Sequence, residues 1–164
     1  MKYDFDKPTN RRNTYSYKWD VAEGELPMWV ADMDFEAPPC VKNALVERAE
    51  HGIFGYSYVP AEYFEAISDF WASRHGWRPD PKSMIFSTGV VATISSVVRK
   101  LTTPAEKVLI QAPVYNIFYN CISNNGRVIL SNDLVRKDGR YYIDFEDLEA
   151  KLADPQTTLM ILCN

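Results

Sequence analysis

A turn that leads directly into a helix is the first stretch of this sequence whose residues could bind a ligand. In "FSTGVVATISS", residues 86–96, Thr88 can cap a helix and Gly89 allows a tight backbone turn. The first amide groups of a helix have no partner within it and carry the positive end of the helix dipole, so they bind phosphate or carboxylate. The same junction also occurs as a purely structural turn, and the stretch alone leaves both interpretations open. It lacks the glycine fingerprint of dinucleotide sites and the Lys-Ser/Thr ending of a P-loop.

Tyr115 is the second candidate. In "QAPVYNIFYN", residues 111–120, it follows a predicted strand, at the edge where open parallel sheets bind ligands. Its flat ring could stack on a planar cofactor. Phe118, Tyr119 and Ile122 have the spacing of one helix face, so we expect them in the core.

Two more tyrosines, Tyr56 and Tyr58, lie in the loop "IFGYSYVP" at residues 53–60. The loop is bounded by glycine and proline and has no helix or strand period. Its position leaves open whether the two hydroxyl groups bind an anion or lie on the surface.

These groups need a scaffold, and the apolar pattern from residue 84 onward predicts alternating strands and helices. We expect strands at residues 84–88, 107–112, 127–133 and 158–164, helices at 89–101, 114–126 and 145–152, and an Asp-Gly turn at 138–139. Such alternation indicates crossover units and a parallel sheet, so the fold class is α/β.

The part before residue 84 has a different character. Residues 1–26 are polar and irregular, as in an arm that lies on a surface. Two amphipathic helices follow, and each ends at a His-Gly pair, at His51 and at His75, so both histidines are expected at helix termini.

Composition restricts the classes of protein. The chain has 164 residues, of which 46% are hydrophobic and 24% charged, with a net charge of -4, as in a soluble globular protein that does not bind nucleic acid. It has no apolar run long enough for a membrane span and no secretory signal, which predicts a cytoplasmic location. Cys40, Cys121 and Cys163 are odd in number and widely spaced, so we expect buried free thiols rather than a disulfide or a metal site.

Five motifs taken together resemble one family. "LPMWVADMDF", "HGIFGYS", "STGVVATIS", "APVYNIFY" and "LMILCN" stand in the order and spacing of the N-terminal part of the class I/II aminotransferase superfamily. More narrowly they resemble its cystathionine beta-lyase branch, the MalY/PatB group of carbon-sulfur lyases. The resemblance implies the fold-type I fold, a parallel-type sheet with flanking helices. It also implies pyridoxal 5'-phosphate as cofactor, an amino-acid substrate such as cystathionine or cysteine, and a homodimer.

The resemblance also implies roles for particular residues. The cofactor phosphate would bind the backbone amides of Gly89, Val90 and Val91, and Tyr115 would stack on the cofactor ring. Tyr56, or Tyr58 if the register differs, would reach the phosphate of the neighbouring subunit. The substrate carboxylate would pass the backbone around Val30, Ala31 and Asp32.

The family's domain plan implies that residues 1–52 belong to the small domain and residues 53–164 begin the large cofactor-binding domain. The family's cofactor-bonding lysine, its aspartate at the pyridine nitrogen and its substrate-binding arginine would all lie beyond residue 164. We therefore expect an N-terminal fragment that has no catalytic residue of its own and is inactive alone. The alternative is a non-catalytic anion-binding or dimerisation module derived from the same fold. A doubly wound nucleotide-binding domain is disfavoured, because no acidic residue follows Gly89 at the ribose-binding spacing.

Overall fold

The computed structural model describes residues 4–163. The chain forms two compact units, with the boundary between Tyr58 and Val59. The sequence predicted a boundary six residues earlier, after residue 52, and the assignment of the parts to a small and a large domain stays a prediction. Within residues 4–163, no helix is both long enough and apolar enough to cross a membrane.

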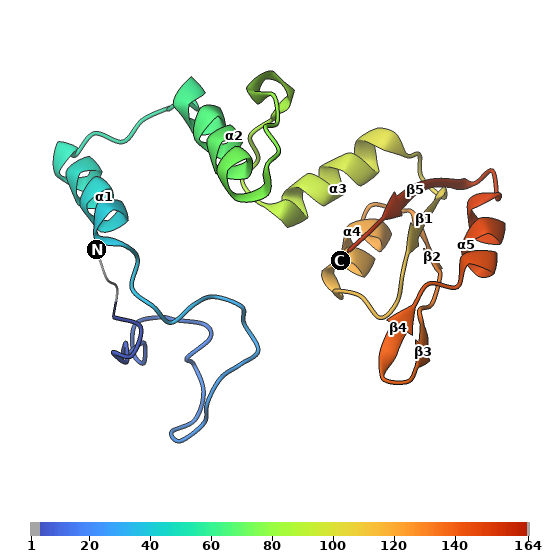
Figure 1. Cartoon of the computed structure of the whole chain (residues 1–164), viewed down its shortest axis with the longest axis horizontal. Helices are drawn as coiled ribbons and strands as arrows, with labels where there is room; N and C mark the ends of the chain where they lie inside the picture. Colours follow the sequence, from blue (N-terminus) through green and yellow to red (C-terminus); the bar gives the residue numbers. More distant parts are fainter. Residues whose placement is uncertain (1–3, 164) are drawn as a thin grey trace. The chain divides into compact units, whose positions relative to one another are not determined.

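The first unit contains an irregular arm and one helix, α1 (Pro39–His51), drawn in blue and cyan in Figure 1. Pro39 occupies the first helical position, where its fixed φ suits the helix and its missing N–H is not needed. As predicted, the helix ends at His51. Gly52 takes a left-handed φ of 72° there and donates its amide to the Ala49 carbonyl at 3.1 Å.

The second unit begins with α2 (Ala61–His75) and a short 3-10 turn, η1 (Pro81–Ser83). The second predicted His-Gly ending is also confirmed, because Gly76 caps α2 with a φ of 67°. Ser68 is fully buried and donates its hydroxyl to the Pro79 carbonyl, which holds the returning chain against the helix.

A three-stranded parallel sheet forms the centre of the second unit, with β1 (Lys107–Ile110) between β2 (Val128–Ser131) and β5 (Thr157–Ile161). The connections run through α4 (Ile117–Ser123) and α5 (Phe145–Leu152), and α3 (Val90–Leu101) precedes β1. Val108 pairs with Ile129 on one side and with Leu159 on the other. The predicted crossover units and the α/β fold class are therefore confirmed.

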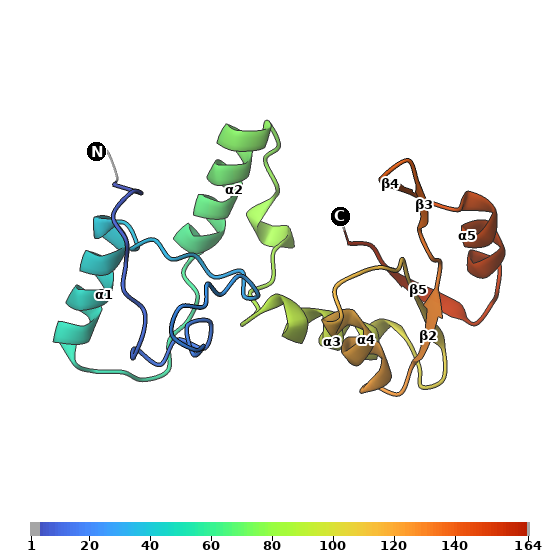
Figure 2. The same ribbon diagram turned by 90° about the horizontal axis from the view of Figure 1, so that it is seen from below.

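The core lies where α3 and α4 cover one face of this sheet. Val98 of α3, Val108 and Ile110 of β1, and Ile122 of α4 have no exposed surface. The period of the strand turns Leu109 to the opposite face, the side on which Figures 1 and 2 show α5.

The connection from β2 to α5 contains a small hairpin of β3 (Val135–Lys137) and β4 (Arg140–Tyr142). Asp138 and Gly139 have φ angles of 51° and 76°, as a two-residue hairpin turn requires. The predicted Asp-Gly turn is confirmed. The predicted helix after it is also present, and the Asp144 carboxylate caps it by accepting the Asp147 amide at 3.1 Å.

Three expectations about local structure were wrong or incomplete. The predicted strand at residues 84–88 is not a strand, because within the part of the chain that the structure describes no neighbouring strand pairs with it, and Ile85 stays 94% exposed. The last strand pairs with β1 and ends at Ile161, before residue 164, which lies outside the described residues. The cysteines are free, but only Cys121 is buried, since the helix that carries Cys40 presents no buried side chain.

Candidate functional site

The first turn of α3 provides the backbone donors of the candidate site. The first backbone hydrogen bond of this helix runs from the Thr93 amide to the Gly89 carbonyl, at 3.0 Å, so the amides of Val90 and Val91 precede the helical ladder. The turn contains no acidic side chain, and the side chains of Val90 and Val91 are 74% and 46% exposed. An open, positively polarised helix end of this kind binds anions.

Side chains from both ends of the turn hold it in shape. The Thr93 hydroxyl donates to the Ser87 hydroxyl at 2.7 Å and also lies 2.9 Å from the Gly89 carbonyl. The Ser87 hydroxyl in turn lies 3.3 Å from the same carbonyl. Sequence reasoning missed Ser87 and Thr93, although two hydroxyl residues six positions apart around a glycine were a usable signal.

Two reasons given for this turn need correction. Thr88 does not cap the helix, because the N-cap residue is Gly89 and no side chain makes a cap hydrogen bond. Gly89 does not supply a tight turn either, since its φ of 169° is an extended angle that any residue adopts. A Cβ at this position would meet nothing within 4 Å. A side chain at this position would therefore enter open space.

Packing directs this helix end to the carboxyl edge of the sheet. Residues 102–106 join α3 directly to β1, and Ile94 and Val98 pack over the β1 core residues, so α3 runs back along the strand. Its first turn also contacts α4, where the Cys121 thiol lies 3.9 Å from the Val91 carbonyl. In parallel sheets the carboxyl edge is where ligands bind.

Tyr115 lies between β1 and α4, near the same edge. Its ring is 57% exposed and meets Phe118 edge-on, with the ring centroids 5.7 Å apart. More than half of the surface of Tyr115 therefore stays accessible to a ligand. Phe118 and Ile122 are buried and Tyr119 packs against the core, as the helical spacing predicted.

The loop tyrosines make no contact that defines a role. Tyr56 and Tyr58 are 112% and 86% exposed and belong to the end of the first unit. A hydroxyl group in that position is free to meet another molecule. The role of either tyrosine at a neighbouring subunit's phosphate stays a prediction.

Residues Val30, Ala31 and Asp32 lie in the first unit, and their surroundings are well defined. The Asp32 carboxylate pairs with Arg11 at 2.6 Å, and the Asp32 carbonyl accepts a hydrogen bond from the Lys18 ammonium at 2.8 Å. Val30 is half-buried and Ala31 is exposed. Their role in binding a substrate carboxylate stays a prediction.

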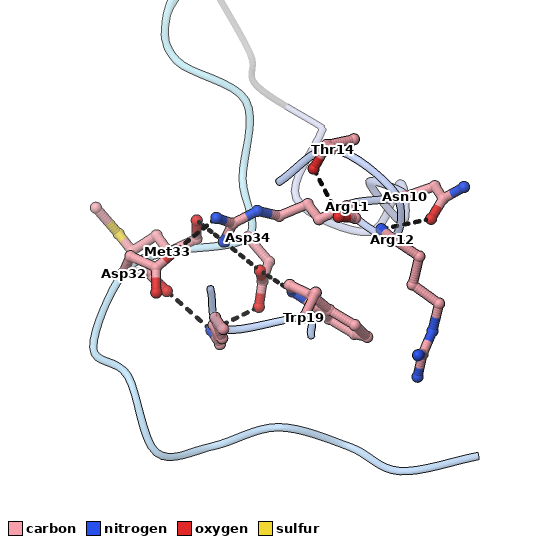
Figure 3. A network of polar contacts seen from close by, with 9 residues as sticks. Asn10, Arg11, Arg12, Thr14, Trp19, Asp32, Met33 and Asp34 are labelled. Atoms are coloured by element: carbon pink, nitrogen blue, oxygen red, sulfur yellow. Dashed lines mark hydrogen bonds and ion pairs between the residues drawn. The ribbon is translucent and has the colours of Figure 1, made fainter. Parts of the chain in front are cut away.

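Asp34 is the centre of this cluster, which Figure 3 shows. It accepts hydrogen bonds from Lys18 at 2.8 Å, from the Trp19 indole at 2.7 Å and from Arg11 at 2.7 Å. These donors, Lys18 foremost, hold the pKa of the Asp34 carboxyl far below its usual value. We call Arg11, Lys18, Trp19, Asp32 and Asp34 the Asp34 network.

Sequence reasoning missed the Asp34 network. Lys18, one of its members, is only 8% exposed. The available signal was the spacing of Asp32 and Asp34, since residues two apart in an extended segment lie on one face and two adjacent carboxylates require cations. The polar arm was expected to lie on a surface, and its contacts in the first unit include this Asp-x-Asp segment.

The comparisons with known proteins agree on one family. Residues 26–164 match the model of the family "Aminotransferase class I and II". The chain is 50% identical over 98% of its length to cystathionine beta-lyase PatB of Bacillus subtilis, and 31% identical over 99% to the protein MalY of Escherichia coli. In both cases it spans 43% of the relative's own length.

Solved structures agree as well. Cystalysin from Treponema denticola, which contains pyridoxal 5'-phosphate, superposes with a TM-score of 0.89 at 33% identity, covering 98% of this chain and 43% of cystalysin. The pyridoxal-phosphate-bound C-S lyase from Staphylococcus hominis gives 0.86 at 32% identity, with 98% and 42% coverage. The matched family model covers most of the chain, and the chain therefore belongs to the class I and II aminotransferase family.

Proposed function

We propose that this chain is part of a pyridoxal-phosphate-dependent carbon-sulfur beta-lyase that acts on cystathionine-like amino acids, in the cytoplasm and as a homodimer. The observation that carries the proposal is the 50% sequence identity to a cystathionine beta-lyase over 98% of this chain. An aminotransferase of the same family is the second candidate, because the family model and the fold serve both activities.

The residues present fit the cofactor. The open space at Gly89, the amides of Val90 and Val91, and the absence of an acidic side chain from the first turn of α3 suit a dianionic phosphate. The accessible ring of Tyr115 suits a pyridine ring. Tyr56 would come to the phosphate from the neighbouring subunit, which would make the site a property of the dimer.

When bound, pyridoxal phosphate supplies the electron sink that stabilises negative charge on the substrate Cα. The residues of this chain would bind and orient the cofactor and the substrate. The α3 amides fix the phosphate, Tyr115 restricts the ring to one plane, and the segment from Val30 to Asp32 holds the substrate carboxylate. Fixing both reactants in this way converts a bimolecular reaction into an intramolecular one.

A lysine from outside residues 1–164 would complete the site. Four lysines of this chain are committed to ion pairs: Lys18 with Asp34, Lys42 with Glu36, Lys107 with Asp154 and Lys151 with Asp147. A lysine that bonds to the cofactor must be free of such a partner, and the family's cofactor-bonding lysine is expected beyond residue 164. We therefore propose that the 164-residue chain alone does not catalyse the reaction.

The reaction products would test the proposal. The complete enzyme should release a thiol, ammonia and a 2-oxo acid in equal amounts from cystathionine, without an added 2-oxo acid. Dependence on an added 2-oxo acid, with no thiol released, would support the aminotransferase in place of the lyase.

A second experiment uses the 164-residue chain alone. Borohydride treatment in the presence of pyridoxal phosphate should label no single lysine stoichiometrically. One stoichiometric site would refute the claim that the chain lacks the lysine, and a stable chain that binds phosphate without any complete enzyme would favour the non-catalytic module.

A further inference from the structure

The segment around Val30 and Ala31 is anchored at both ends by the same N-terminal arm. On one side the Trp29 ring packs edge-on against Tyr17, with centroids 4.7 Å apart. On the other side Asp32 is held by Arg11 and Lys18. The two residues between these anchors therefore bridge two fixed points.

The network on the second side fixes peptide groups and not only side chains. Lys18 donates to the Asp32 carbonyl at 2.8 Å, and Arg11 donates to the Met33 carbonyl at 3.3 Å, as Figure 3 shows for Arg11. A peptide group is planar and trans, so a fixed carbonyl also fixes the direction of the N–H on its other side. The backbone from Asp32 to Asp34 consequently has one orientation.

The backbone groups between the anchors are unused. Among residues 4–163, none donates to or accepts from the backbone of Val30 or Ala31. Unpaired amide groups, in a segment whose neighbouring residues are held by the arm, are suitable partners for a carboxylate.

The charge of the network does not oppose an anion here. Arg11 and Lys18 carry two positive charges, and Asp32 and Asp34 carry two negative charges, so the network is neutral as a whole. The Asp34 carboxyl keeps its negative charge to unusually low pH because Lys18, Trp19 and Arg11 donate to it. The two aspartates therefore place no uncompensated negative charge beside an arriving carboxylate.

We propose that Arg11 and Lys18 are positioning residues of the substrate site, which hold Asp32 and Asp34 so that the free backbone of Val30 and Ala31 faces the carboxylate of the amino-acid substrate. This inference rests on the proposed lyase function. It assigns the positioning of the substrate-binding segment to two cations that do not themselves contact the substrate. They act through a segment that lies 12 to 23 residues further along the chain.

The test combines two measurements. In the complete enzyme, Lys18→Met should raise the KM for cystathionine about fivefold or more and change kcat by less than about twofold, because a pre-formed binding segment is lost while the reacting atoms are unaffected. In the 164-residue chain, the same variant should lower the NMR backbone order parameters of residues 30–34, because the Asp32 carbonyl loses the donor that holds it. The matched control is Lys42→Met, which removes an exposed lysine paired with Glu36 at 2.9 Å and should change neither measurement.

Two further variants separate geometry from charge and guard against misfolding. Arg11→Lys keeps the charge but loses the two-pronged contact to Asp32 and Asp34, so KM should rise less than in Lys18→Met. Asp34→Asn makes the network one unit more positive. If geometry decides, KM rises as in Lys18→Met; a fall in KM would mean that charge alone acts, and would overturn the inference.

The possible failures are distinguishable. A wild-type complete enzyme that releases no thiol would refute the proposed function before any variant is compared. An active wild type whose KM is unchanged by Lys18→Met would refute the positioning role and leave the proposed function intact. Unchanged order parameters at residues 30–34 in Lys18→Met would refute the positioning role for the chain itself, whatever the result with the complete enzyme.

Discussion

Asn132 is a buried polar residue at the end of β2 whose loss should be costly. It has no exposed surface, and its side-chain amide makes three hydrogen bonds. The oxygen accepts from Gln111 at 2.8 Å, and the nitrogen donates to the Asp144 carbonyl at 3.1 Å and to the Asp147 carboxylate at 2.7 Å. The residue therefore ties the carboxyl edge of β1 to the start of α5.

The magnitude follows from these contacts. In Asn132→Ala the two neutral bonds should cost about 1 kcal/mol each and the bond to the carboxylate about 2 kcal/mol. Gln111, which is 8% exposed, is left with a donor that protein no longer satisfies. We expect the free energy of unfolding to fall by roughly 3 kcal/mol, since water can replace part of what is lost, and this is a large share of an ordinary domain's stability.

The assay must report on the sheet. All four tryptophans lie at or before Trp77, so tryptophan fluorescence reports on other parts of the chain. Hydrogen exchange of the β1 and β2 amides, or urea unfolding followed by circular dichroism with an unchanged m-value, measures the relevant change.

A matched control is Asn120→Ala, which replaces an exposed asparagine on α4 with a better helix former and should be neutral or slightly stabilising. A loss below about 1 kcal/mol in Asn132→Ala would refute the reasoning, because it would mean that the three hydrogen bonds give no net stability. The variant Asn132→Asp places a second carboxylate beside Asp147. It should be destabilised at neutral pH and partly recover on acidification.

Three further outcomes are expected. In the complete enzyme, Tyr115→Ala should weaken cofactor binding by roughly twofold to tenfold, whereas Tyr119→Ala should lower the melting temperature instead, and equal effects on the cofactor dissociation constant would show that the wrong aromatic was chosen. Gly89→Ala should leave stability within about 0.5 kcal/mol of wild type but reduce phosphate affinity, since its methyl group enters the open space before α3; a large drop in stability would contradict the extended φ. Lys107 and then the Gln156 amide lower the pKa of Asp154, so the stability that Asp154 provides is present above the usual carboxyl pKa and is lost as pH falls below it. In Asp154→Asn, the free energy of unfolding should therefore fall less on acidification than it does in the wild type, as measured by unfolding at a series of pH values.

Local signals account for most of the fold that the sequence predicted. Gly52 and Gly76 end two helices, Asp144 caps a third, and the pair Asp138 and Gly139 makes a hairpin turn. Each of these effects acts within a few residues, so each can be predicted from the local sequence. The predicted strand at residues 84–88 failed because a strand depends on a partner that the same few residues cannot specify.

The candidate site divides in the same way. The open helix start of α3 was predictable, although the reason for Gly89 was not the expected one, and anion binding there stays a prediction. The Asp34 network was missed because Arg11 and Lys18 meet their carboxylates across 14 to 23 residues of irregular chain, where no periodic pattern brings them together. The substrate segment could be named only by resemblance, and its anchoring required the structure.

The thiol of Cys121 gives this chain an internal chemical reporter. It is 2% exposed and contacts the Val91 carbonyl in the first turn of α3, whereas Cys40 and Cys163 are exposed. An alkylating reagent should therefore label two thiols at once and reach the third only when α3 and α4 separate. The slow phase of labelling measures how often that helix pair opens. A ligand that settles on the first turn of α3 should lengthen this phase, so occupancy can be followed on the unmodified chain without a spectroscopic cofactor.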